Sequence, residues 1–108
     1  MVKWVLMNDK LSQETFSELL NTTFQVKLDT PGPVDLELSE VKNHRGADRE
    51  QDGTVQFSVF FTGPTNLFLP QGIYTLAHER MGAFDIFLVP VGRDENTFHY
   101  EAVFNYLK

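Results

Sequence analysis

Apolar and polar residues alternate with a period of two along most of this chain, and this pattern constrains the fold more than any other feature. The clearest run places Val55, Phe57, Val59 and Phe61 at alternate positions and ends at a Gly-Pro pair. Successive side chains of a β-strand point to opposite faces, so the run predicts a strand with one buried face. Comparable runs, bounded by Gly, Pro, Asn or Asp, cover residues 23–28, 34–39, 73–78, 84–89 and 98–106.

Six such segments joined by short turns predict a mainly β fold, a small antiparallel sandwich or barrel of six to seven strands. Residues 2–6 are the candidate for the seventh strand. The first two segments flank a Pro-Gly-Pro turn at 31–33 and predict a hairpin with one wet face. Residues 84–89 are apolar at nearly every position, which predicts a central strand covered on both faces. Residues 42–53 are almost wholly polar and predict a solvated loop.

One segment near the start has helical rather than strand periodicity. Ser12 is a good N-cap residue, and Phe16, Leu19 and Leu20 follow at the spacing that puts apolar side chains on one helical face. Asn21 is a plausible stop. The sequence therefore predicts one short N-terminal helix of about two turns, which is too short to be stable without packing against the sheet.

The length of 108 residues is typical of one domain, so residues 1–108 are expected to form a single β-rich unit around one core. Ten phenylalanines supply much of the apolar surface for that core. The absence of cysteine excludes disulfides, thiolate metal sites and a cysteine nucleophile.

Charge and hydropathy exclude several classes of partner. The formal charge of −6 repels nucleic-acid phosphates and anionic lipid, so we expect neither nucleic acid nor a membrane as partner. No apolar run approaches the roughly 20 residues that a membrane-spanning helix needs. The apolar run at 4–7 is shorter than the core of a signal peptide, which favours a cytoplasmic location.

Several motifs of the second half carry a resemblance to a known family. They are Phe-Thr-Gly-Pro at 61–64, Leu-Pro-Gln-Gly-Ile-Tyr at 69–74, Phe-Leu-Val-Pro-Val at 87–91 and Tyr-Glu-Ala-Val-Phe-Asn at 100–105. Together with the helix at 11–20, they resemble a bacterial family of small β-rich domains of unknown function, sometimes found with phage-tail-collar-like proteins. The resemblance implies a fold and a bacterial context, but it supplies no catalytic residue.

A search for catalytic motifs assigns no catalytic residue. No serine lies in a Gly-x-Ser-x-Gly elbow, and no Gly-rich loop ends in Gly-Lys-Ser/Thr to hold a phosphate. His44, His78 and His99 are scattered, with no pair at i and i+4 that could share a metal. We therefore expect no cofactor, and the sequence argues against an enzyme more than for one.

A candidate ligand pocket combines Tyr74, His78 and Glu101. His78 could orient a base or bind an ion if it pointed into a cavity beside Tyr74. The simpler interpretation makes His78 a hydrogen-bonded histidine of the core or the sheet edge. Glu101 falls on the polar face of its strand, where a solvated or salt-bridged carboxylate is the simpler interpretation. We favour these structural roles over the pocket.

Leu67, Phe68 and Leu69 form an apolar run between Pro64 and Pro70, in a segment expected to be a loop. One interpretation is that these side chains close one end of the sandwich or barrel, with Phe68 as the plug. The other is that they form an exposed patch that docks a partner protein. We favour the plug.

The best metal-binding motif lies in the polar loop, where Asp48, Glu50 and Asp52 alternate before Gly53. This resembles the opening of a calcium-binding loop, in which carboxylates at alternate positions precede a turn-forming glycine. The closing bidentate glutamate of such a loop would fall on Val59. We therefore expect no metal site here, and calcium is not an expected ligand.

Two functional classes stay open on the sequence alone. The first is a non-enzymatic protein-binding or assembly module, in a phage-like particle or with a surface fibre, whose partner is another protein or a second copy. The second is a small-molecule-binding β-barrel or minor enzyme that uses Tyr74, His78 and Glu101. The lack of catalytic motifs favours the first.

Calcium should leave the stability of the protein unchanged. A site filled a hundredfold above its dissociation constant would add about 2.7 kcal/mol to the free energy of unfolding. Thermal melts with millimolar calcium or with a chelator should coincide. A clear upward shift that disappears in Asp52→Ala would contradict this.

Overall fold

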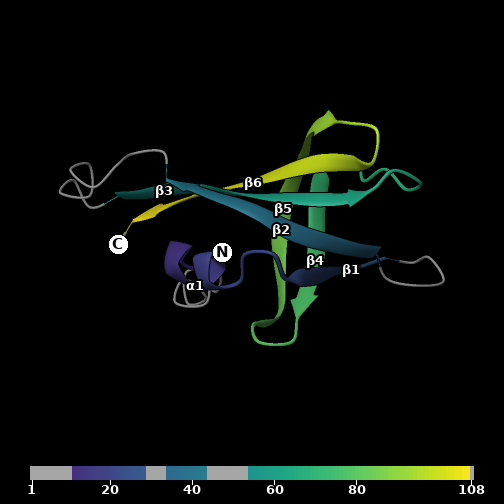
Figure 1. Cartoon of the computed structure of the whole chain (residues 1–108). Helices are drawn as coiled ribbons and strands as arrows, with labels where there is room; N and C mark the ends of the chain where they lie inside the picture. The colour runs from purple at the N-terminus through teal and green to yellow at the C-terminus, as the bar shows by residue number, and fades with distance from the viewer. Residues whose placement is uncertain (1–10, 29–33, 44–53, 108) are drawn as a thin grey trace.

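Six antiparallel strands close into a barrel in the computed structural model, which describes residues 11–28, 34–43 and 54–107 (Figure 1). One short helix precedes the strands. This confirms the predicted mainly β fold, in its barrel form. Residues 2–6 lie outside the described residues, so the seventh strand stays a prediction. The elements are α1 (Gln13–Glu18), β1 (Thr23–Lys27), β2 (Val34–Asn43), β3 (Thr54–Pro64), β4 (Gly72–His78), β5 (Gly82–Arg93) and β6 (Thr97–Leu107).

The strand order around the barrel is β1-β2-β3-β6-β5-β4, and a short β1–β4 ladder from Gln25↔Ala77 to Lys27↔Thr75 closes it. The predicted first hairpin is confirmed by the β1–β2 pairing. Because β3 pairs with β2 and β6 whereas β4 pairs with β1 and β5, the connection 65–71 must cross one end of the barrel. The helix enters β1 from the opposite end. The topology therefore brings one segment to each mouth.

The β3–β6 ladder is the longest, running from Thr54↔Leu107 to Pro64↔Thr97. Register shifts at Leu38/Glu40 in β2 and at Pro90/Gly92 in β5 mark β-bulges, which bend strands and help a sheet to close. β2 runs on to Asn43, so the predicted loop at 42–53 begins two residues too early. Residues 44–53 lie outside the described residues.

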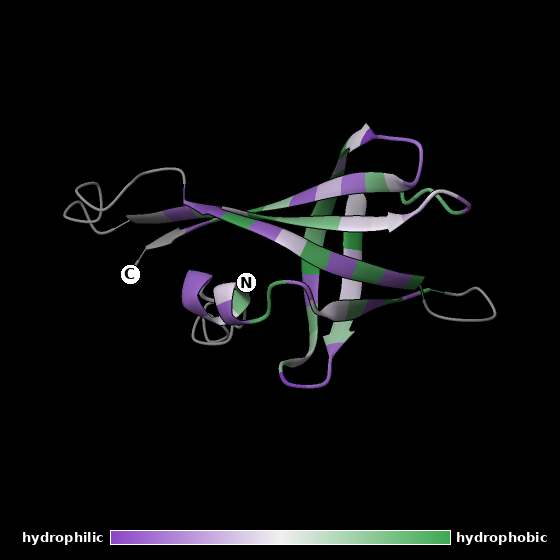
Figure 2. Cartoon of the chain, viewed as in Figure 1, coloured by the Kyte–Doolittle hydropathy of each residue, from purple (hydrophilic) through white to green (hydrophobic). Residues whose placement is uncertain are grey.

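Hydrophobic and hydrophilic residues alternate along the first part of β2 (Figure 2), and the hydrophobic ones there are buried whereas their neighbours are exposed. Phe57, Val59 and Phe61 of β3 are fully buried, which confirms the strongest strand prediction. Gly63 continues this strand where a Cβ atom would lie 2.6 Å from Leu36 Cδ2 and 3.4 Å from Tyr100 Cε2. The close approach of these buried side chains explains the glycine.

The prediction that residues 84–89 are covered on both faces is wrong. Phe84, Ile86 and Leu88 of β5 face the interior, whereas the Phe87 side chain is 48% exposed on the outside. In a single closed barrel only the inner face of each strand contacts the core. The outer face of β5 is therefore apolar without being buried.

Helix α1 begins where the sequence predicts. The Ser12 side chain accepts a hydrogen bond from the Thr15 N–H at 3.1 Å and so caps the helix. The helix ends at Glu18, and Asn21 takes a left-handed backbone conformation with φ at 68°. Phe16 and Leu19 are buried, but Leu20 is 38% exposed, so its predicted place on the buried stripe is wrong. Leu20 follows the end of the helix, where the helical spacing no longer applies.

Phe16 inserts its ring from α1 into the barrel mouth. Its centroid lies 5.5–6.3 Å from four other phenylalanine rings: those of Phe24 on β1, Phe57 on β3, Phe84 on β5 and Phe104 on β6. These spacings suit edge-to-face and offset aromatic packing. One helical side chain thus joins four strands.

Truncation of Phe16 should destabilise the barrel strongly. Phe16→Ala removes a fully buried ring and should lower the free energy of unfolding by about 3–5 kcal/mol. The half-exposed Leu20 of the same segment is the control, because Leu20→Ala should change it by less than about 0.5 kcal/mol. Urea denaturation of both variants measures the difference. Equal midpoints would show that α1 is not part of the core.

Candidate functional site

The structure does not bring Tyr74, His78 and Glu101 into one pocket. Tyr74 and His78 share the inner face of β4 but are four residues apart, which is roughly 13 Å along a strand. Glu101 alternates with the buried Tyr100 and Ala102 on β6 and so lies on the outer face. Each of the three has a separate structural setting.

Tyr74 holds the loop that crosses the barrel end. Its hydroxyl donates a hydrogen bond to the Pro70 carbonyl oxygen at 2.5 Å. Burial, followed by the neighbouring Tyr100, raises the pKa of Tyr74 above its usual value. The phenol therefore stays protonated near neutral pH and acts as a donor.

Glu101 and Ser58 connect β6 to β3 on the outside of the barrel. The Ser58 hydroxyl donates a hydrogen bond to Glu101 Oε2 at 2.6 Å, and the Ser58 side chain is fully buried. Hydrogen bonds to a carboxylate are stronger than neutral ones. The arrangement fits a cross-strand tie better than a catalytic acid.

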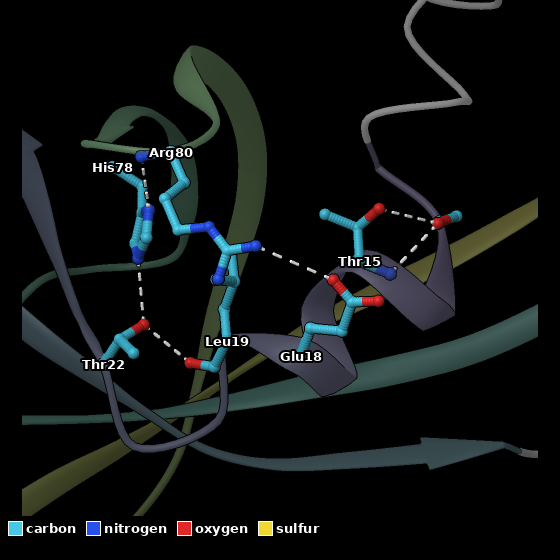
Figure 3. Close-up of polar contacts among 7 residues, drawn as sticks. Thr15, Glu18, Leu19, Thr22, His78 and Arg80 are labelled. Carbon is cyan, nitrogen blue, oxygen red and sulfur yellow. Dashed lines mark hydrogen bonds and ion pairs between the residues drawn. The ribbon is translucent and has the colours of Figure 1, made fainter.

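His78 is the most constrained polar side chain of the three, because both of its ring nitrogens have partners (Figure 3). The Arg80 backbone N–H donates to Nδ1 at 3.0 Å, so Nδ1 carries no proton. The Thr22 hydroxyl donates to the Leu19 carbonyl oxygen at 2.6 Å and must therefore accept the proton of His78 Nε2 at 2.9 Å. The network is complete only for a neutral ring protonated at Nε2.

His78 is only 6% exposed, and its ring lies 4.5 Å from the Phe24 ring, centroid to centroid. Burial lowers the pKa of His78; Glu79 opposes this shift, whereas Arg80 adds to it. The sequence-based interpretation of His78 as a hydrogen-bonded core histidine matches this geometry.

An open cleft of about 620 Å³ lies where β1 meets the β4–β5 turn, next to His78. All of its lining residues except Ala77 have polar side chains, and its one ionisable ring already has a partner at both nitrogens. An acid-base role would require that network to break first. The lining residues are Thr22, Thr23, Gln25, Ala77, His78, Glu79 and Arg80.

A second polar cluster shapes the β5–β6 turn. Asp94 accepts hydrogen bonds from the backbone N–H groups of Asn96 and Thr97, each at 2.9 Å. Its other oxygen lies 3.0 Å from His99 Nε2. These contacts, with that to His99 the largest, lower the pKa of Asp94 well below its usual value. The cluster is exposed and is fully explained by the turn that it stabilises.

Within the described residues, no group of three or more His, Cys, Asp or Glu side chains could hold a metal ion. The proposed calcium ligands Asp48, Glu50 and Asp52 lie outside that part of the chain, so that question stays a prediction. Among the same residues, no helix is long and apolar enough to cross a membrane.

The apolar loop closes the second barrel mouth, but Phe68 is not the plug. Leu69 is only 3% exposed, and its N–H donates to the Tyr100 hydroxyl at 3.1 Å inside the barrel. Leu67 packs partly against the core. Phe68 is 48% exposed and lies edge-on against Phe98. Leu69 therefore points inward and Phe68 outward.

A further surface feature lies on the outside of β4 and β5, which sequence reasoning missed. Ile73 is 73% exposed and is the cross-strand partner of Phe87, which is half exposed. Val91, in the β5 bulge, is also about half exposed. We call Ile73, Phe87 and Val91, with the half-buried Val89 between the last two, the outer apolar face. The apolar outward positions of 84–89 were the signal for it.

The fold and its two closed ends define a small six-stranded β-barrel domain with a helical plug at one mouth. Residues 11–104 match the protein family described as a domain of unknown function (DUF6916), and the chain belongs to that family. No curated protein and no solved structure matches the chain.

Alanine substitutions in the loop 65–71 should show that Leu69 contributes more to stability than Phe68 does. Leu69→Ala should lower the free energy of unfolding by about 2–5 kcal/mol, because it empties the buried position that closes the mouth. Phe68→Ala should cost clearly less, because half of its ring is already in water. Chemical denaturation of the two variants compares them directly. A larger loss for Phe68→Ala would make Phe68 the plug after all.

Proposed function

We propose that this domain is a non-enzymatic protein-binding or assembly module and that its contact surface is the outer apolar face. The observation that carries the proposal is the pairing of Ile73 with Phe87 on the outside of the barrel, where both side chains are exposed. Apolar side chains that gather on an otherwise polar surface are typical of interaction sites.

The interior of the barrel supports a binding surface rather than an internal ligand site. Phe24, Phe57, Phe61 and Tyr100 are fully buried between the strands, and Phe16 fills one mouth. A core filled with aromatic rings has no room for a ligand between them. Recognition by this domain therefore depends on its exterior.

Charge indicates which kind of partner would fit. The chain has a formal charge of −6, so two copies repel each other, whereas a basic protein is attracted. Acidic side chains border the outer apolar face: Asp85 precedes Phe87 on the outside of β5, and Glu101 is the cross-strand partner of Val89. We infer a protein partner with an apolar centre and basic residues around it.

The family resemblance of the sequence motifs gives this proposal its setting. It supports an assembly role in a bacterial context, in a phage-like particle or as an accessory to a surface fibre. A closed barrel whose ends are both plugged would act in such an assembly through its outer surface.

The test is a measured affinity for an identified partner. A protein captured from the host by the wild-type chain is identified, purified and titrated calorimetrically. Phe87→Ser and Ile73→Ser should each weaken binding at least about tenfold, equivalent to about 1.4 kcal/mol. Leu20→Ser is the matched control, because Leu20 is an exposed apolar residue near the other end of the barrel.

Two outcomes would contradict the proposal. Unchanged affinity in Phe87→Ser and Ile73→Ser would move the contact surface elsewhere. Sedimentation that shows a wild-type dimer, converted to monomer by Phe87→Ser, would make a second copy the partner instead of a basic protein.

A further inference from the structure

We propose that His78 and Thr22 form a pH-sensitive latch that holds α1 in the barrel mouth at neutral pH and releases it under mildly acidic conditions. The latch lies at the mouth beside α1 and does not depend on the outer apolar face. It rests on the hydrogen-bond geometry around His78 and on the dependence of α1 on contacts outside the helix.

Helix α1 cannot hold itself in place. Six residues are too few for a stable isolated helix, so the helix depends on the packing of Phe16 and Leu19 and on the turn that follows it. Backbone bonds tie that turn to β2, from the Asn21 N–H to the Leu38 carbonyl and from the Leu38 N–H to the Thr22 carbonyl. Only the contact between Thr22 and His78 among the described hydrogen bonds ties it to β4.

The contact from Thr22 to His78 continues into the end of the helix. The Thr22 hydroxyl donates to the carbonyl oxygen of Leu19, the C-cap residue, at 2.6 Å (Figure 3). His78 Nε2–H, the hydroxyl and this carbonyl therefore form a directed chain from β4 to α1. The Arg80 N–H can only donate and the Leu19 carbonyl oxygen can only accept, so these two groups fix the direction of every hydrogen bond between them.

Protonation of His78 conflicts with the hydrogen bond at its other ring nitrogen, Nδ1. A proton on Nδ1 would face the Arg80 backbone N–H, which now donates to Nδ1 at 3.0 Å. Two donors cannot share this contact, so the ring or the β4–β5 turn has to move. The ring is also packed against Phe24 and nearly excluded from water, which makes a buried positive charge costly.

Among the described residues, three charged groups lie around the latch. Glu79 and Arg80 flank it on the β4–β5 turn, and Glu18 on α1 forms an exposed ion pair with Arg80 at 3.8 Å. Histidine is the side chain whose ordinary change of charge falls between pH 5 and 8. Phe24, on β1, contributes no charge. Between pH 7.5 and 5, His78 is therefore the group of this cluster that changes its charge.

The sign of the pH effect follows from the open and closed states. Burial lowers the pKa of His78 in the closed state, whereas an opened, hydrated His78 should titrate near its usual value of about 6.5. Opening then takes up a proton below about pH 6.5. The opening constant should rise as pH falls, by at most about tenfold per pH unit for one proton, until the closed state also titrates.

Native-state hydrogen exchange of the full chain from pH 7.5 to 5.0, corrected for intrinsic exchange rates, measures this opening. The reporters are the amides of Phe16, Leu19 and Thr22, whose bonds form α1 and its last turn. Amides of the β3–β6 ladder report global unfolding in the same sample. Protection at the α1 reporters should fall with pH while the ladder stays protected.

Three variants isolate the latch. His78→Asn retains an acceptor for the Arg80 N–H but cannot titrate, so the α1 reporters should be less protected at pH 7.5 and should lose most of their pH dependence. Thr22→Val removes the hydroxyl and should raise opening at pH 7.5. Thr22→Ser restores the hydroxyl and should behave as wild type.

The proposal is overturned if the α1 reporters keep their protection down to pH 5.0, or if His78→Asn shows the wild-type pH slope. The ¹⁵N imidazole signals of His78 report the protonation state of the ring in the wild-type protein. This measurement does not depend on whether any variant folds. A ring protonated at Nδ1 while α1 stays fully protected would contradict the latch. A neutral ring in the closed state, with opening that increases as pH falls, would support it.

Discussion

Burial of the Phe16 ring among phenylalanines from four strands is the contact on which the rest of this barrel depends. A six-stranded barrel has an apolar interior that meets water at both mouths unless other residues cover them. The chain covers one mouth with a single helical side chain and the other with Leu69 from the loop that crosses it. Packing at the two mouths therefore completes the core that the strands begin.

Local periodicity predicted the strands and the helix because both depend on near neighbours in the chain. The Ser12 cap and the alternating residues of β3 are visible in the sequence and were found as predicted. The choice between sandwich and barrel was not visible, because it rests on the short β1–β4 ladder between distant segments. The same pattern of one buried face would serve either architecture.

The candidate site shows where periodicity fails. Periodicity correctly placed Tyr74 and His78 on one face of β4. Two side chains on the same face can still lie far apart along the strand, as these two do. Periodicity misjudged β5, because an apolar outward residue such as Phe87 has the same sequence pattern whether its face is covered or exposed. Phe68 was wrongly predicted to be the plug because a loop has no fixed period from which to assign inward positions.

Some parts of the molecule can change their contacts more easily than others. The ring-filled interior and the long β3–β6 ladder leave little freedom between the strands. The outer apolar face is exposed and can gain or lose contacts while the barrel stays closed, whereas release of α1 would also withdraw the Phe16 ring from the core. The two lie on different parts of the molecule, the outside of β4–β5 and the mouth beside β1. A partner bound to the first would leave the second accessible, so the proposed docking and the proposed helix release would not conflict sterically.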